Sequence, residues 1–271
     1  MSQQPGNAAS PALSEIAQSF VQARREGRAL PDFPGEIPPD LETAYRVQDL
    51  AIAQWADTVV GWKVGYIAAE RRDASGDERL LGPIFTRAVW NATGSIPVEF
   101  PVFQGGFAAV EAEYVLQLEA DAPDQTHYTP EQAEAVPARL YLGVEIASSP
   151  LATINKLGPR VVISDFGNNN GLILGAEVSD WRARDESSLR AQTLIEGEIV
   201  GSGGATLLPG GLRAAYAFAL GRSARRGRPL KRGDLIATGN ATGIHDIRVG
   251  QTALIRFEGV GEIHCRAIAA G

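Results

Sequence analysis

The sequence is poor in the residues that staple small secreted proteins or hold thiolate-bound metals. Among its 271 residues it has one cysteine, Cys265, and three histidines. A single cysteine excludes an internal disulfide and a structural zinc site built from thiolates. We therefore expect a protein of a reducing compartment, the cytoplasm, whose core is held together by apolar packing.

Long hydrophobic runs and an excess of positive charge are also absent. No stretch approaches the roughly 18 uninterrupted apolar residues of a membrane span, and residues 1–10 lack the basic and apolar regions of a signal peptide. The 25 basic and 32 acidic residues give a net charge of −7. Nucleic acids and anionic membranes are bound by net basic surfaces, so we expect neither as a partner.

What the sequence does contain is the composition of an ordinary globular protein, with 44% hydrophobic and 21% charged residues. Apolar residues recur at helical spacing in 10–26 and 41–55, and Asp40 precedes the second helix as its N-cap. A strand is expected over 58–66. Further strands are expected over 107–118, 141–147, 171–176, 194–200, 234–237 and 253–257, and further helices over 130–138 and 211–224.

This order of elements predicts an α+β fold in three parts. We expect a disordered leader over 1–10, a smaller helical N-terminal lobe over 11–70 and a β-rich catalytic body over 71–271. No internal repeat is visible, so a solenoid or propeller is excluded.

The strongest chemical signal is a pair of glutamates, Glu111 and Glu113, in an otherwise apolar run, followed by Glu145 in another expected strand. Residues two apart on a strand point to the same face, where two like charges repel. A divalent cation would reverse that cost, and hard oxygen ligands select Mg²⁺ or Mn²⁺. The bare pattern taken alone favours a solvated face of an amphipathic strand, and both readings stay open.

A lone cation, Lys63, lies in the apolar, glycine-flanked segment 61–65. A lysine there could neutralise a bound carboxylate or, with its pKa lowered by burial, exchange protons. The alternative is a lysine at a strand end whose ammonium reaches solvent along its aliphatic stem.

Six short motifs then occur in the order found in the fumarylacetoacetate hydrolase superfamily. Taken together they resemble the branch of 2-keto-4-pentenoate (2-hydroxypentadienoate) hydratases and 4-oxalocrotonate decarboxylases, over about residues 40–268. The motifs are Gly61-Trp62-Lys63-Val64-Gly65, Gly82-Pro83-Ile84-Phe85, Val110-Glu111-Ala112-Glu113, Gly143-Val144-Glu145, Ser164-Asp165 with Gly171-Leu172-Ile173-Leu174-Gly175, and Thr238-Gly239-Asn240-Ala241-Thr242-Gly243.

The resemblance implies a fumarylacetoacetate-hydrolase-like catalytic body, a bound Mg²⁺ or Mn²⁺ and a small 2-keto acid substrate. By position it assigns metal ligands, catalytic residues and substrate-binding residues. These are Glu111, Glu113 and Glu145 for the metal, Lys63 and Asp165 for catalysis, and Asn168, Thr238 and Gly239 for the substrate. It also implies a homo-oligomer, alone or in a complex with a paralogous pathway enzyme.

Two positions depart from the family pattern. Where the family has a segment similar to D-E-P-D-Y-G, this chain has Asp77-Glu78-Arg79-Leu80-Leu81-Gly82, so Leu80 replaces a candidate proton carrier. Where hydratases have D-N-A-S-S, Asn168 and Asn169 supply amides in place of hydroxyls.

The expected activity is a metal-dependent hydro-lyase that adds water across a 2-hydroxydienoate, as in meta-cleavage degradation of aromatic compounds. Decarboxylation of an oxalocrotonate-type acid or C–C hydrolysis on the same scaffold is the alternative. The hydrolases use a His-x-x-Glu pair, and none of the three histidines is followed by glutamate at that spacing. A non-catalytic assembly partner of such an enzyme is the competing class.

Overall fold

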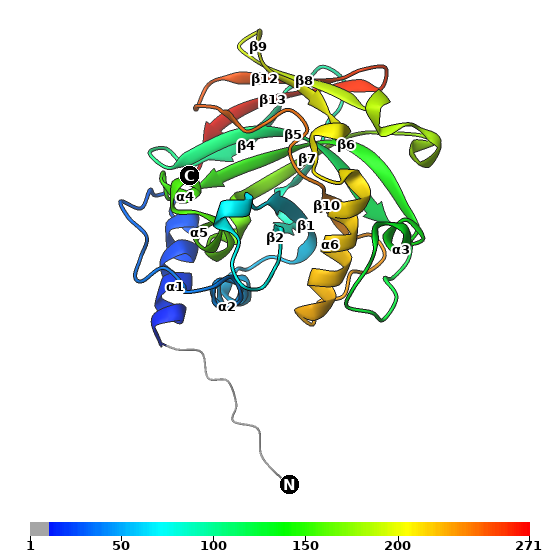
Figure 1. Ribbon diagram of the computed structural model, residues 1–271. Coiled ribbons are helices and arrows are strands. Elements are labelled where there is room, and N and C mark those ends of the chain that lie inside the picture. Colours follow the sequence, from blue (N-terminus) through cyan, green and yellow to red (C-terminus); the bar gives the residue numbers. More distant parts are fainter. Residues whose placement is uncertain (1–10) are drawn as a thin grey trace.

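The computed structural model describes residues 11–271, and the leader expected over 1–10 lies outside the described residues. Helices cover one side of a curled eight-stranded sheet, and a five-stranded sheet covers the other (Figure 1). This mixture of helix and strand confirms the α+β expectation. None of the helices in this part of the chain has the length and hydrophobicity for crossing a membrane.

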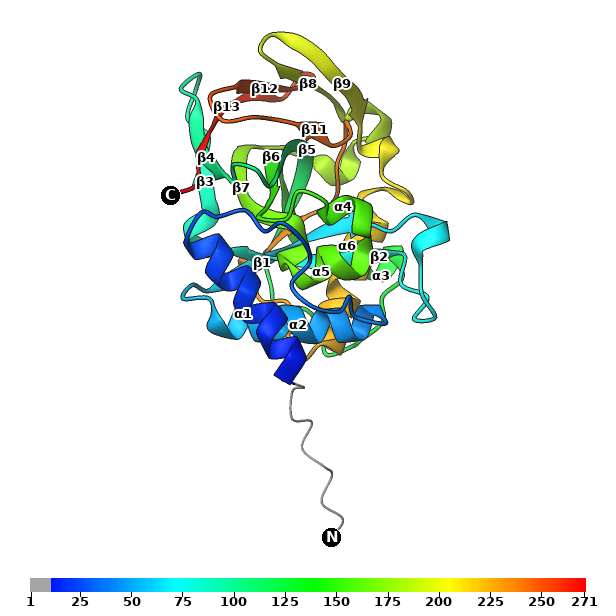
Figure 2. The same cartoon turned by 90° about the vertical axis from the view of Figure 1, so that its left-hand side faces the viewer.

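Two N-terminal helices form the layer farthest from the five-stranded sheet (Figures 1 and 2). They are α1 (Pro11–Arg25) and α2 (Leu41–Gln54). The predicted N-cap is confirmed, because the Asp40 side chain accepts a hydrogen bond from the Thr43 amide at 2.7 Å. The short helices α4 (Ile154–Leu157) and α5 (Pro159–Ser164) continue this layer, and α5 packs against α2.

The eight-stranded sheet carries the chemistry. Its path runs β2 (Arg79–Phe85), β1 (Val59–Tyr66), β10 (Leu235–Ala237), β5 (Phe107–Leu118), β6 (Ala138–Ser149), β7 (Asn169–Glu177) and β3 (Val89–Asn91), with β11 (His245–Asp246) also paired to β5. The sheet curls until β2 approaches β7. Side chains on the inner face of the curl therefore converge from strands that are far apart in sequence.

The second sheet packs on the outer face of β5 and β6. Its order is β4 (Val98–Val102), β13 (Gly261–Ala269), β12 (Thr252–Phe257), β8 (Arg190–Ile195) and β9 (Glu198–Gly204). Tyr114 of β5 meets Phe257 of β12 edge to face, with ring centroids 5.5 Å apart. Alternate residues of β5 face this contact, so the remaining ones, which include both glutamates, face the inside of the curl.

Two expected elements are wrong in extent. The single strand over 194–200 is a hairpin, β8 and β9, because Glu196 and Gly197 take left-handed backbone angles (φ 51° and 85°) that reverse the chain. The helix over 130–138 ends early as α3 (Pro130–Glu134), because Pro137 cannot continue it and Ala138 already begins β6. The helix expected over 211–224 is confirmed as α6 (Gly211–Arg225).

The division of the chain at residue 70 stays a prediction. Strand β1 lies within the eight-stranded sheet, between β2 and β10. The helices α1 and α2 therefore stand before a strand that already belongs to the sheet of the expected body.

Candidate metal and catalytic site

Three glutamates meet on the inner face of the curled sheet. Glu111 of β5 pairs directly with Glu145 of β6, and Glu113 follows two residues along the same face. One carboxylate oxygen from each residue lies within 4.8 Å of the others. Their side chains are buried, with exposed fractions of 4% for Glu111 and 0% for Glu113 and Glu145. The reading of a solvated strand face is therefore wrong.

Lys63 joins this group because of strand register. It pairs with Ala237 of β10, which pairs with Val115 of β5, and cross-strand neighbours share a face of the sheet. Its ammonium Nζ lies 3.1 Å and 3.4 Å from the two carboxylate oxygens of Glu145. At 6% exposure, Lys63 does not reach solvent along its stem.

Burial opposes the charge of Lys63, but the carboxylates of Glu145, Glu111 and Glu113 outweigh it and raise the lysine pKa above 10.5. Lys63 is therefore an ammonium ion at neutral pH. A lysine with a lowered pKa, which the sequence left open, is not the state that this cluster favours.

The pKa values of two of the acids are also raised, which for a carboxyl group favours the neutral form. Burial and the neighbouring Glu145 carboxylate raise the pKa of Glu111 to about 7, although Lys63 and a hydrogen bond from Asn240 lower it in part. Burial and the charges of Glu145 and Glu111 raise the pKa of Glu113 well above 4.5. Three acids thus share one cation, and the cluster is short of positive charge.

The loop after β10 completes the wall beside Glu113. The amide and the hydroxyl of Thr238 donate to the Tyr114 carbonyl at 3.1 Å and 2.8 Å. The Gly239 amide donates to Glu113 Oε2 at 2.7 Å, and the Ala241 amide bonds to the β5 carbonyl at residue 112. Gly239 has φ 121°, a conformation that favours glycine. The loop therefore takes the place of a neighbouring strand along the glutamates.

The residues present fit a divalent cation. The second oxygen of Glu113, Oε1, is buried and has no hydrogen-bond partner. Buried polar atoms are normally partnered, so this oxygen is positioned for a ligand that the protein itself does not supply. Three converging carboxylates are the hard oxygen donors that Mg²⁺ and Mn²⁺ prefer, and within residues 11–271 no other group of at least three acidic, histidine or cysteine side chains meets at such distances.

A cavity of about 480 Å³ opens onto this cluster. Lys63, Glu111, Asn168 and Asn240 contribute to its lining. Leu80 also lines it, so the position of the missing family acid is an apolar patch of wall.

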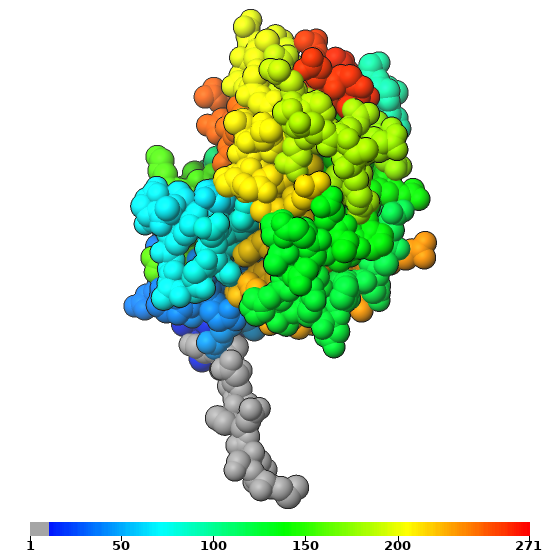
Figure 3. Space-filling view, turned by 45° about the vertical axis from the view of Figure 1, so that its right-hand side comes forward, coloured from blue at the N-terminus to red at the C-terminus, as the bar shows by residue number. Residues whose placement is uncertain are grey.

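Thr238 and Gly239 line an adjoining cavity of about 310 Å³, which shares Tyr66 and Asn240 with the first. Arg79 also lines this cavity and donates to the Pro209 carbonyl. Figure 3 shows the two segments that meet there, the cyan one that contains β2 and the yellow one that leads into α6, side by side on the surface.

Asp165 is held away from the cavity. Its carboxylate oxygens bind the Arg24 guanidinium at 2.5 Å and 3.0 Å, and the Ser149 hydroxyl donates to it at 2.6 Å. Asp165 is 1% exposed and is not part of the cavity lining. Its predicted catalytic role stays a prediction, and its surroundings favour a role in positioning.

Three residues of this region were not predicted to have a role. The Asn169 amide donates to Glu145 Oε1 at 3.1 Å, Asn240 bonds Glu111, and Arg24 binds Asp165. The sequence indicated Asn169 only as an amide in place of a family hydroxyl and Asn240 only as part of a motif, both beside predicted residues. Arg24 lies 141 residues before its partner, and no local pattern indicates it.

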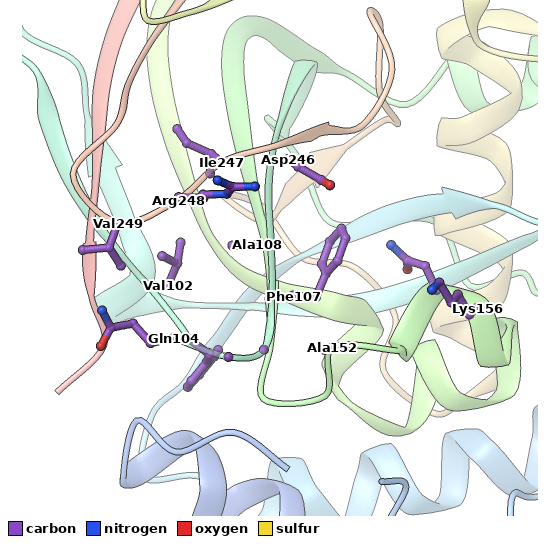
Figure 4. A pocket seen from close by; sticks show the side chains of 14 residues that line it. Val102, Gln104, Phe107, Ala108, Ala152, Lys156, Asp246, Ile247, Arg248 and Val249 are labelled. Carbon is purple, nitrogen blue, oxygen red and sulfur yellow. The ribbon is translucent and has the colours of Figure 1, made fainter. Parts of the chain in front are cut away.

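A larger cavity, of about 720 Å³, lies apart from this cluster. It lies at the start of β5, where Phe107 faces Asp246 of β11 and Arg248 of the following connection on one side and Lys156 of α4 on another (Figure 4). It contains none of the three glutamates and no part of Lys63. The smaller cavity, which reaches the carboxylate cluster at Glu111 and Lys63, is therefore the candidate site.

The fold and the sequence both resemble enzymes of one superfamily. No family profile matches the chain. It is 26% identical over 257 residues to a 2-keto-4-pentenoate hydratase of Paraburkholderia xenovorans, covering 92% of each protein. It is 25% identical over 258 residues to a 4-oxalocrotonate decarboxylase of a Pseudomonas species, covering 93% of this chain and 96% of the relative.

Among solved structures, the fold matches 4-oxalocrotonate decarboxylase from Pseudomonas putida G7 complexed with magnesium and adipate. The TM-score is 0.78 at 19% identity, over 94% of this chain and 97% of that one. The resemblance that the motifs predicted is thereby confirmed: this chain has the fumarylacetoacetate-hydrolase-like fold and is similar, along nine tenths of its length, to the hydratase and decarboxylase branch of that superfamily.

Proposed function

We propose that the chain is a divalent-metal-dependent lyase that acts on a small 2-keto acid, with hydration of a 2-hydroxydienoate as its reaction. The observation that carries the proposal is the buried cluster of three carboxylates and one lysine, of which Glu111 and Lys63 line a cavity. The similarity to a hydratase and a decarboxylase over nearly the whole chain supports the same reaction class.

In this proposal Glu111, Glu113 and Glu145 hold Mg²⁺ or Mn²⁺. When bound, the cation supplies Lewis-acid stabilisation of the negative charge that develops on a 2-keto acid as it enolises. The Gly239 amide fixes the orientation of Glu113, and Asn169 fixes that of Glu145. Fixed ligands suit a site that must hold two substrate oxygens in one geometry.

Lys63 has two tasks in the proposal. Its ammonium group provides the positive charge that balances the substrate carboxylate at the wall of the cavity. The proton on Nζ is also the one we assign to transfer between substrate carbon and water. The Asn168 and Asn240 side chains supply hydrogen-bonding groups at the same wall. Thr238 lines the adjoining cavity, and we assign it to contact with the substrate there.

Decarboxylation is the second candidate, and Leu80 favours it. An apolar side chain stands where the family has an acid. Loss of CO₂ from the distal carboxyl of an oxalocrotonate-type acid sends the electrons of the broken C–C bond to the conjugated 2-keto group, so it needs an electron sink there rather than an acid that protonates or activates water. C–C hydrolysis is disfavoured because the sequence has no His-x-x-Glu pair. A scaffold role is disfavoured because a scaffold gains nothing from three buried acids that repel one another.

The first test is calorimetric titration of metal-stripped protein with Mn²⁺, and then with oxalate, a chelating mimic of a 2-keto acid enolate. We expect Mn²⁺ to bind and oxalate to follow only when Mn²⁺ is present. Glu113→Gln should abolish Mn²⁺ binding and leave the fold intact, whereas the exposed Glu119→Gln serves as a matched control with wild-type binding. Wild-type protein that binds no Mn²⁺ would refute the proposal.

Two assays on the Mn²⁺-bound protein distinguish hydration from decarboxylation. Hydration consumes a 2-hydroxydienoate without gas release, whereas decarboxylation of an oxalocrotonate-type acid releases CO₂. Release of CO₂ without hydration activity would show that decarboxylation, rather than hydration, is the reaction. The homo-oligomer, the complex with a paralogous enzyme and the cytoplasmic location stay predictions, and light scattering checks the first.

A further inference from the structure

The segment that carries Asn168 and Asn169 has an unusual backbone. Phe166, Gly167 and Asn168 have φ angles of 52°, 65° and 63°, so three consecutive residues are left-handed. For residues other than glycine this conformation is strained, and it persists only where the surroundings impose it. Something outside the segment must therefore hold it.

The turn is pressed against β2 on one side. A Cβ on Gly82 would lie 2.3 Å from the Phe166 carbonyl oxygen, and one on Gly167 would lie 2.5 Å from the Gly82 Cα. Gly82 pairs with Lys63 across β1 and β2. The turn therefore passes directly beside the strand position that carries the active-site lysine.

On the other side the segment is held by Arg24 of α1, a helix that contributes no residue to the lining of the candidate site. The guanidinium binds the Asp165 carboxylate at 2.5 Å and 3.0 Å and the Asn169 carbonyl at 3.1 Å. It also donates to the Asn170 side chain at 3.1 Å and to the Ser148 carbonyl at 3.2 Å. These contacts lie on both sides of the left-handed turn.

Arg24 is fixed in its own place. It is 6% exposed, and its guanidinium carbon lies 5.0 Å and 5.5 Å from the ring centroids of Phe166 and Phe103. A guanidinium between two aromatic rings is stabilised by cation–π attraction and presents its donors in a rigid plane. Lysine has one point charge and could not make the same set of bonds.

One residue, Asn169, connects Arg24 to the carboxylate cluster. The Asn169 carbonyl accepts from Arg24, and the side-chain amide of Asn169 donates to Glu145 Oε1 at 3.1 Å. Glu145 in turn contacts Lys63. A continuous path of hydrogen bonds therefore runs from the N-terminal helix to a candidate metal ligand.

We propose that Arg24 is a positioning residue for the metal site: by clamping residues 165–170 in their left-handed turn, it holds the Asn169 amide on Glu145. This inference rests on the proposed function, because it concerns the same carboxylates. It assigns Asp165 to the clamp, as the counter-charge of Arg24, rather than to proton transfer.

The experiment is calorimetric titration of the full chain with Mn²⁺ for Arg24→Met, Asn169→Leu and the double variant. Loss of a group that orients a metal ligand lowers metal affinity about 10- to 100-fold, and we expect each single variant to fall in this range. Because both substitutions break the same path, the double variant should bind no more than about twofold more weakly than the weaker single variant.

A matched control separates positioning from a general loss of stability. Val21→Ala removes buried apolar contacts from the same helix and keeps Arg24, whose guanidinium makes the bonds to residues 165–170. It should lower the melting temperature and leave Mn²⁺ affinity at the wild-type value. Arg24→Lys should recover part of the affinity lost in Arg24→Met, because it restores the charge and part of the hydrogen bonding.

The outcomes are distinguishable. Wild-type protein that binds no Mn²⁺ refutes the proposed function and this inference with it. Folded Arg24→Met protein with wild-type affinity, losses that multiply in the double variant, or an equal loss in Val21→Ala overturns the inference alone. If Arg24→Met does not fold, Arg24→Lys and Asn169→Leu decide the question, and wild-type affinity in both overturns it.

Discussion

Replacing Glu111 by glutamine should stabilise the metal-free protein. Glutamine keeps the size of the side chain and an acceptor oxygen, but it removes one of three carboxylates that are buried together. The cluster has one cation, Lys63, for three acids. In the absence of metal, neutralising one acid therefore relieves repulsion and removes the cost of burying a charge.

The magnitude follows from the pKa of Glu111, which burial and Glu145 raise from 4.5 to about 7. A carboxyl with a higher pKa in the folded state binds its proton more tightly when folded, so its ionisation destabilises the fold as pH rises from 4.5 through 7. At about 1.4 kcal/mol per pKa unit, the full cost above pH 7 is about 3 kcal/mol. At pH 5 less than about 1 kcal/mol of this cost is present.

The assay is thermal unfolding of wild type and Glu111→Gln in EDTA at pH 8 and pH 5. For a chain of this size, about 3 kcal/mol corresponds to a rise of about 6–12 °C in melting temperature at pH 8. The rise should nearly vanish at pH 5. Added Mn²⁺ should then raise the melting temperature of the wild type and not that of the variant. The difference between the two melting temperatures should therefore shrink or change sign. A variant that melts at or below the wild type at pH 8 in EDTA would refute this reasoning.

Two substitutions and one chemical probe test other parts of the structure. Lys63→Met should keep Mn²⁺ binding by calorimetry and lose turnover, because the metal ligands remain while the proton on Nζ is gone; an unchanged rate would return Lys63 to a structural role. Gly82→Ala should lower the free energy of unfolding by about 1–3 kcal/mol in urea, because the new Cβ would collide with the Phe166 carbonyl; an unchanged midpoint would contradict the close approach. Cys265 is fully buried, and burial raises its thiol pKa to about 12. It should therefore not react with Ellman's reagent in the native protein and should titrate after unfolding, so rapid native reaction would contradict the burial.

The sequence predicted those parts of the fold that local patterns encode. Helical periodicity placed α1, α2 and α6, and the alternation around Glu111 gave the full extent of β5. It missed α4 and α5, which have 4 and 6 residues and are held by packing against α2 and their neighbours rather than by a long periodic face. It also merged β8 and β9, because the turn depends on a left-handed Glu196, a residue type without turn preference.

For the site, the sequence identified the groups with distinctive chemistry and missed those that hold them. A pair of glutamates in an apolar strand is visible in one line of sequence, and so is a lone lysine between glycines. The side chains of Asn169 and Asn240 that bond the glutamates are ordinary polar residues in loops. Their role depends on tertiary contacts that no spacing encodes.

The difference has a physical basis in how the charge cluster is stabilised. Each buried acid needs a donor that lies across from it in space, and in the curled sheet such donors come from other strands or from the connections between them: Lys63 from β1, the Gly239 amide from the loop after β10, and Asn169 from the start of β7. Even with these partners the pKa values of Glu111 and Glu113 stay raised, and Glu113 Oε1 stays without a partner. The protein thus brings in enough donors to orient the glutamates and too few to neutralise them. A divalent cation would supply the missing positive charge, and the repulsion that it relieves would contribute to its binding free energy. The same carboxylates that destabilise the metal-free fold would therefore bind a metal well.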